Sequence, residues 1–153
     1  MKLQIITVGK KNSLELNALI GDYEKRISIF NSIRWILIKP SSLPQYLAIN
    51  KESEEIIKML PDKSIVWLLD ERGQQLNNYQ LTEKITGVAQ EKDNCLVIII
   101  GGPYGVTDQV KEKANFIWSM SKLVFPHQLI RLLLTEQLYR SNEIIKNSGY
   151  HHN

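Results

Sequence analysis

The residues best suited to proton chemistry are three histidines near the end of the chain. His127, His151 and His152 all lie within residues 119–153, and the sequence contains no other histidine. The imidazole exchanges protons near neutral pH, so this segment could supply a general acid or base. His127 follows Pro126 at the point where an apolar run gives way to a helical pattern. These two elements must therefore position the imidazole.

The same part of the chain carries the excess positive charge. From residue 113 onward the net charge is +3, equal to the formal net charge of the whole chain, so residues 1–112 are neutral overall. The cations of this part are Lys113, Lys122, Arg131, Arg140 and Lys146. Charge concentrated in one region favours a polyanion or an anionic small molecule as partner, although a solvated basic helix has the same pattern.

A glycine-rich turn is the second candidate for chemistry. Residues 101–105 (GGPYG) lie between an apolar run and a predicted helix, where missing side chains allow backbone to approach a ligand. The turn is not the G-x-G-x-x-G of dinucleotide-binding proteins, and the phosphate-loop pattern G-x-x-x-x-G-K-[ST] is absent. Taken alone, this pattern is also typical of an ordinary strand-to-helix turn.

Other catalytic classes have little support in the sequence. No G-x-S-x-G elbow is present, and the adjacent carboxylates Asp70 and Glu71 are poorly placed to share a proton, which disfavours hydrolase chemistry. The single cysteine, Cys95, cannot form an internal disulfide and is typical of a packed thiol. No Cys/His spacing resembles a zinc site, so we expect no metal.

The composition is that of one domain spanning residues 1–153. Of the 153 residues, 43% are hydrophobic and 23% charged, and no low-complexity linker interrupts them. The longest apolar run, residues 95–100, is far shorter than the roughly 20 residues that cross a bilayer. The N-terminus, MKLQIITVGKK, does not have the pattern of a secretory signal. We therefore expect a cytoplasmic protein without a membrane span.

Hydrophobic periodicity predicts alternating strands and helices. Strands are predicted over Lys2–Val8, Ile33–Ile38, Ser64–Leu69, Leu96–Ile100 and Leu123–Phe125. Helices are predicted from Ser13 to Phe30, from Ser42 to Leu60, from Asn77 or Asn78 to Asp93, from Thr107 to Asn115 and from Gln128 to Lys146. Continuous apolar strands alternating with helices indicate an α/β fold. We expect a mostly parallel sheet of five to six strands with helices on both faces.

Parallel sheets bind ligands just beyond the carboxyl ends of their strands. Three turns qualify here, namely residues 70–74 (DERGQ), residues 101–105 and the pair Pro126-His127. In the last helix the spacing places Leu129, Leu133 and Ile144 toward the core. Glu136 and Arg140 are four residues apart and can form a surface ion pair.

Three motifs read together resemble a known family. IGGPYG, then WSMSKLVFPHQLIRLLLTEQLYR, then the terminal GYHHN are similar to the ribosomal RNA large subunit methyltransferase H (RlmH) family. These small SPOUT methyltransferases methylate N3 of a pseudouridine in large-subunit (23S) ribosomal RNA. The similarity covers the entire chain, including MKLQIITVGK and LLDERG. It implies a C-terminal trefoil knot, a homodimer, S-adenosyl-L-methionine as methyl donor, and ribosomal RNA or the ribosome as substrate.

The resemblance also implies site residues. The cofactor site of the family falls on Leu69, Gly101, Gly102, Ser121, Lys122, Leu123, Val124, Phe125 and Pro126. Leucine, valine and phenylalanine side chains would line a slot for adenine, and Gly102 would leave room for the ligand. Tyr104 stands where close relatives are expected to have Glu, and GYHHN ends the chain where they read more like PYHRE. These departures put an acidic role at residue 104 and one RNA-contacting charge in doubt.

Catalytic and RNA-binding roles follow from the same resemblance. His127, Arg131 and His151 are the candidates to remove the N3 proton or to stabilise the charge that develops on the base. RNA contacts are expected from Lys122, Arg140, Lys146, Tyr150 and His152. Two other classes stay open: a non-catalytic, flavodoxin-like RNA-binding module, and a methyltransferase acting on a small molecule. A bulky residue at position 102 should abolish methylation but leave a pure RNA binder unaffected.

Overall fold

The computed structural model describes residues 1–91 and 95–147. Strands and helices alternate along this part of the chain. The strands are Lys2–Val8 (β1), Ser32–Ile38 (β2), Ile65–Gln75 (β3), Cys95–Ile100 (β4) and Phe116–Ser119 (β5). The helices are Leu14–Arg26 (α1), Gln45–Lys58 (α2), Asn78–Gln90 (α3), Asp108–Lys113 (α4) and His127–Ile145 (α5).

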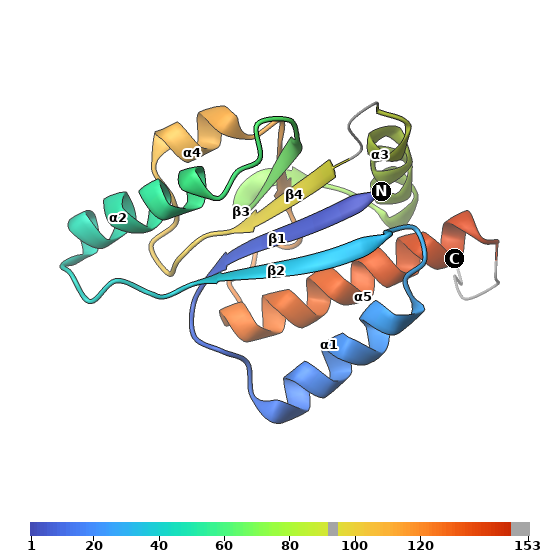
Figure 1. The fold of residues 1–153 in the computed structure, drawn as a ribbon, viewed down its shortest axis with the longest axis horizontal. Coiled ribbons are helices and arrows are strands. Elements are labelled where there is room, and N and C mark those ends of the chain that lie inside the picture. The colour runs from blue at the N-terminus through green and yellow to red at the C-terminus, as the bar shows by residue number, and fades with distance from the viewer. Residues whose placement is uncertain (92–94, 148–153) are drawn as a thin grey trace.

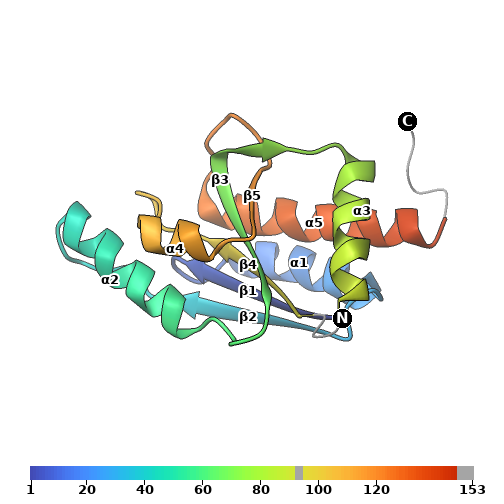
Figure 2. The same ribbon diagram turned by 90° about the horizontal axis from the view of Figure 1, so that it is seen from above.

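The strands form one parallel sheet in the order β2-β1-β4-β3-β5. Helices α1, α3 and α5 cover one face, and α2 and α4 cover the other (Figures 1 and 2). The predicted α/β architecture is confirmed, with five strands among the described residues. The trefoil knot stays a prediction, because strand order and pairing do not define how the chain threads.

Strand β4 shows why the apolar runs are continuous. Leu96, Ile98 and Ile100 pack into the core under α1, α3 and α5, whereas Val97 and Ile99 pack into the core under α2 and α4. Successive side chains of a strand point to opposite faces, so a strand covered on both sides has no polar position. Burying one such side chain contributes roughly 1.5–3 kcal/mol, which anchors the centre of the sheet.

Helix starts follow local capping chemistry. The Ser13 hydroxyl accepts a hydrogen bond from the Leu16 N–H at 3.3 Å, as its predicted N-cap role requires. Asn77 and Gln80 form a reciprocal capping box at the start of α3. Both caps satisfy backbone donors that a helix leaves unpaired, so these two boundaries can be read from sequence.

The prediction of a fifth strand at Leu123–Phe125 is wrong. The edge strand β5 is Phe116–Ser119, and residues 123–125 form a loop in which Leu123 is 70% and Val124 84% exposed. Trp118 of β5 packs edge-on against Trp67 of β3, with ring centroids 6.2 Å apart. Tertiary aromatic packing therefore selects the edge strand, and the local apolar triplet does not.

The segment predicted as a loop at residues 70–74 belongs to β3. The strand continues to Gln75, and its register against β5 shifts between Leu69 and Gln74. At Gly73, an added Cβ would lie 2.6 Å from the Ile117 carbonyl oxygen. Glycine thus permits the close backbone approach of the irregular strand pair.

The inward face of α5 also differs from expectation. Leu129, Leu133 and Ile144 are only half-buried. The buried residues are Arg131, Leu134, Thr135, Leu138, Tyr139, Ser141 and Asn142. Asn142 shows how a polar side chain is accommodated on this face: its side-chain Oδ1 accepts hydrogen bonds from the backbone N–H groups of Ser28 and Ile29 at 3.0 Å. Across residues 1–91 and 95–147, no helix has the length and apolar character needed to span a membrane.

Candidate functional site

A cavity of about 460 Å³ lies at the carboxyl ends of β3 and β4. Its walls come from three regions far apart in sequence: the irregular end of β3, the glycine turn after β4, and the loop between β5 and α5. The lining residues are 68–72, 100–106, Trp118, Met120, Ser121, 123–125, His127 and Ile130. The cavity therefore lies where a parallel sheet is expected to bind a ligand.

Most residues proposed for the cofactor line this cavity. They are Leu69, Gly101, Gly102, Ser121, Leu123, Val124 and Phe125. Lys122 and Pro126 are not among the lining residues, although both belong to the same loop. Leu123 and Val124 expose apolar side chains at the cavity wall, which an apolar ring could cover.

The glycine turn is shaped by the protein's own packing. Gly105 has φ +83°, a conformation that favours glycine, and its N–H donates to the Gly102 carbonyl at 2.9 Å. An added Cβ at Gly102 would collide with Glu52 Oε2 and lie 3.5 Å from Val8 Cγ1. Gly102 thus makes room for α2 and β1, and the expectation that it leaves room for the ligand stays a prediction.

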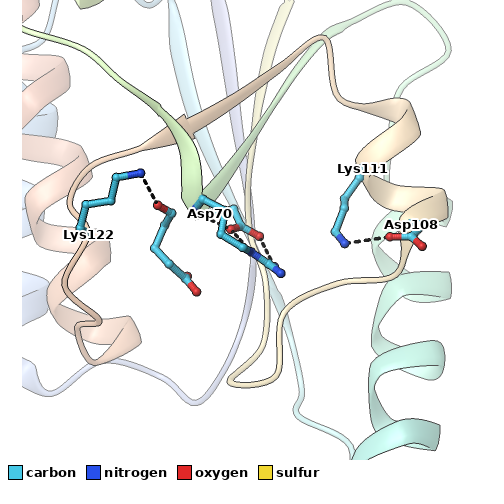
Figure 3. A network of polar contacts seen from close by, with 6 residues as sticks. Asp70, Asp108, Lys111 and Lys122 are labelled. Atoms are coloured by element: carbon cyan, nitrogen blue, oxygen red, sulfur yellow. Dashed lines mark hydrogen bonds and ion pairs between the residues drawn. The ribbon is translucent and has the colours of Figure 1, made fainter.

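A network of polar contacts lies around Asp70, which lines the cavity (Figure 3). Arg72 donates from Nε and Nη2 to the two carboxylate oxygens of Asp70 at 2.9 and 2.8 Å. These hydrogen bonds hold the pKa of Asp70 below its ordinary value and raise that of Arg72. Lys122 Nζ donates to the Glu71 carbonyl at 3.3 Å and so links the loop between β5 and α5 to the end of β3. On the other side of Asp70, Lys111 pairs with Asp108 at 2.8 Å.

His127 is the titratable histidine of the cavity wall. Its side chain is half-buried at the first residue of α5. Burial lowers the pKa of His127 first, the positive charge of Arg131 lowers it further, and the negative charge of Glu52 opposes them. The imidazole is therefore mainly neutral at neutral pH and has a lone pair able to accept a proton.

Comparison with known proteins places this geometry in a family. Residues 1–151 match the model of the family described as "Predicted SPOUT methyltransferase". The chain belongs to the SPOUT methyltransferase family. It is 35% identical over 156 residues to the ribosomal RNA large subunit methyltransferase H of Christiangramia forsetii, covering 99% of each chain. The protein of that name from Natranaerobius thermophilus is 35% identical over 159 residues, covering 99% of this chain and 100% of its own.

A solved structure has the same fold. The probable methylase family protein from Haemophilus influenzae Rd KW20 superposes with a TM-score of 0.54 at 16% identity. The match covers 99% of this chain and 70% of that protein. At this identity the similarity concerns the arrangement of the sheet and helices.

Arg131 lies behind the cavity wall of this SPOUT chain. The residue is 2% exposed and is not among those lining the cavity. Its Nη1 donates to the Lys10 carbonyl at 2.8 Å and to Asn12 Oδ1 at 2.7 Å, and its Nε donates to Thr7 Oγ1 at 3.2 Å. Nη2 has no partner among the described residues, and burial lowers the pKa of the guanidinium. The guanidinium therefore fastens the loop after β1 to α5.

The proposed RNA-contacting residues are distributed along α5 and beyond it. Arg140 pairs with Glu136 at 2.5 Å, which confirms the predicted ion pair, and Lys146 pairs with Glu143 at 3.5 Å. Tyr150, His151 and His152 lie outside the described residues. Within the described ranges, no group of three His, Cys, Asp or Glu side chains could hold a metal ion.

Two residues of α2 at the site were missed by sequence reasoning. Glu52 and Ser53 are 6% and 2% exposed and lie directly behind the glycine turn. Ser53 Oγ accepts the Thr107 N–H at 3.0 Å, and Glu52 Oε1 accepts the Ser41 N–H at 2.8 Å. A signal existed, because Glu52 stands four residues before Ile56 on the apolar stripe of the helix. A carboxylate on such a stripe indicates a buried polar role.

Proposed function

We propose that this chain is a S-adenosyl-L-methionine-dependent methyltransferase that methylates N3 of a pseudouridine in 23S ribosomal RNA, on assembled ribosomes. Full-length similarity to proteins named ribosomal RNA large subunit methyltransferase H supports the substrate. The observation that carries the proposal is the cavity at which three distant segments meet, because seven of the nine proposed cofactor residues and His127 line it.

The cavity walls fit the proposed methyl donor. Leu69, Leu123, Val124 and Phe125 provide apolar surface for the adenine, and the turn at residues 101–105 provides backbone groups for its polar edges. When bound, the donor supplies a methyl carbon attached to a sulfonium, and the carbon–sulfur bond breaks with its electron pair retained by sulfur. The protein must hold acceptor and donor in line and exclude water.

Deprotonation of N3 is the task of the protein's own residues. The neutral imidazole of His127 can accept the N3 proton, with His151 of the chain terminus as the second candidate. Arg131 contributes its buried positive charge from behind the wall and positions the loop after β1. No metal takes part in this mechanism.

RNA and a second protomer complete the proposed assembly. Lys122, Arg140 and Lys146 would contact phosphates, with Tyr150 and His152 contacting the target base or its neighbours. Leu129, Leu133 and Ile144 leave an apolar side of α5 only half-buried, which supports a homodimer through this helix. The proposed location is the cytoplasm, where ribosomes are assembled.

The test is transfer of labelled methyl groups to ribosomes that lack the modification. Label should appear on a pseudouridine of the large-subunit RNA and at N3 of that base. Calorimetry with the donor alone should show binding to the cavity. Turnover without RNA would indicate a small-molecule methyltransferase. RNA binding without turnover or donor binding would indicate a non-catalytic module.

A further inference from the structure

Glu52 is a buried carboxylate beside the cavity. Its side chain lies on α2, the residue is 6% exposed, and the Ser41 N–H donates to Oε1 at 2.8 Å. Within residues 1–91 and 95–147 it forms no ion pair. A buried charge without an opposite charge is strongly unfavourable, and folded proteins usually pair it or neutralise it.

The second carboxylate oxygen lies against the glycine turn. Glu52 Oε2 lies so close to Gly102 that a Cβ there would collide with it, and Gly102 is a lining residue. The carboxylate is therefore in contact with a residue of the cavity wall, although Glu52 itself does not line the cavity. The negative charge also acts on His127 at another wall, where it raises the pKa against the two larger effects.

Other anionic groups of the cavity are less suited to a cationic ligand. The Asp70 carboxylate accepts two hydrogen bonds from the Arg72 guanidinium. Glu71 is exposed to solvent, which screens its charge. The buried cation of this region, Arg131, donates its hydrogen bonds to the loop after β1. Glu52 is thus a buried negative charge beside the glycine turn, and no cation among the described residues pairs with it.

We propose that the Glu52 carboxylate is the counter-charge that selects the positively charged methyl donor over its uncharged product. This inference rests on the proposed function. S-Adenosyl-L-methionine has a sulfonium, whereas S-adenosyl-L-homocysteine, which remains after methyl transfer, has a neutral thioether. A fixed negative charge behind the glycine turn stabilises the bound sulfonium but not the neutral thioether. Loss of the methyl group therefore removes an attraction and favours product release.

The test compares the two ligands by calorimetry on the full-length chain. Glu52→Gln keeps an oxygen able to accept the Ser41 N–H but removes the charge. We expect the Kd for S-adenosyl-L-methionine to rise about tenfold and the Kd for S-adenosyl-L-homocysteine to change by less than about twofold. Glu52→Asp should keep most of the preference. The matched control is Glu54→Gln, an exposed carboxylate on the same helix, which should leave both constants unchanged.

Two further measurements separate charge from architecture. Glu52→Met, neutral and similar in length, should lower the ratio of the Kd for S-adenosyl-L-homocysteine to the Kd for S-adenosyl-L-methionine. Thermal unfolding will show that each variant is folded. The preference of the wild-type chain should persist at about 0.5 M salt, because a buried charge is weakly screened. Equal weakening of both ligands in Glu52→Gln and Glu52→Met would overturn the inference and leave the proposed function intact. Absence of donor binding by the wild-type chain would overturn both.

Discussion

Replacing Arg131 by Met tests whether the buried guanidinium stabilises the fold. The wild-type side chain is 2% exposed and makes hydrogen bonds of 2.7, 2.8 and 3.2 Å to Asn12, Lys10 and Thr7. Met replaces only the aliphatic stem of Arg and has no N–H group that could replace these donors. The acceptors in the loop after β1 lose their partner, and the loop loses its attachment to α5.

The magnitude follows from two opposed effects. Hydrogen bonds from a charged donor contribute about 1.5–3 kcal/mol each, but they share one group and are not additive. Removing the guanidinium also removes the desolvation penalty that lowers its pKa, and its Nη2 has no partner among the described residues. We expect a net loss of about 3 kcal/mol in the free energy of unfolding. For a chain of this size this corresponds to a decrease in Tm of roughly 6–12 °C.

Urea unfolding followed by circular dichroism measures this loss. Arg131→Lys keeps the positive charge but lacks the planar guanidinium. Because the charge is kept, its loss in the free energy of unfolding should be smaller than that of Arg131→Met. Lys25→Met, at a side chain that is 81% exposed, is the surface control and should change stability by less than about 0.5 kcal/mol. A loss below about 1 kcal/mol for Arg131→Met would refute the reasoning. It would show that desolvation cancels the hydrogen bonds and that the residue is not needed for the fold.

Three further predictions concern the core, the glycine turn and His127. Leu134→Ala, at a fully buried residue of α5, should destabilise the chain by about 2–5 kcal/mol in the same unfolding assay, whereas a loss near zero would contradict the packing described. Gly102→Val should displace Glu52 and abolish donor binding in calorimetry; unchanged binding would show that the turn does not shape the cavity. The pKa of His127 is lowered on folding, so its contribution to stability is present above the ordinary value of 6.5 and is lost as pH falls through the folded pKa. Unfolding experiments between pH 7.5 and about pH 5 should therefore show a smaller acid-induced decrease in the free energy of unfolding for His127→Asn than for the wild-type chain. An equal decrease would argue against burial of a neutral imidazole.

Much of the architecture could be predicted because it depends on local patterns. The run from Cys95 to Ile100 is apolar at every position, and only a strand covered on both faces satisfies that pattern. Ser13 and Asn77 cap the helices that follow them, since a side-chain oxygen next to unpaired N–H groups is a local interaction. The turn at residues 101–105 could also be predicted, because its glycines and proline form a local pattern.

The errors arose where distant contacts decide the outcome. Leu123–Phe125 has the composition of a strand, yet the edge position is taken by Phe116–Ser119, whose aromatic rings pack on Trp67. On α5 the spacing of leucines suggested one inward face, but the α1 and α3 surfaces select another face that includes Asn142. A helix has several apolar positions, and only its neighbours determine which of them are covered.

The sequence by itself determined the α/β class, the strand and helix order up to β4, and the position of the glycine turn after β4. Hydrophobic period and capping are short-range properties, so they are visible in the chain before it folds. Only the tertiary structure decided that Arg131 is buried behind the cavity and that Glu52 lies beneath Gly102. Burial of a charge depends on the segments that close over it, and here those segments are up to 124 residues away along the chain.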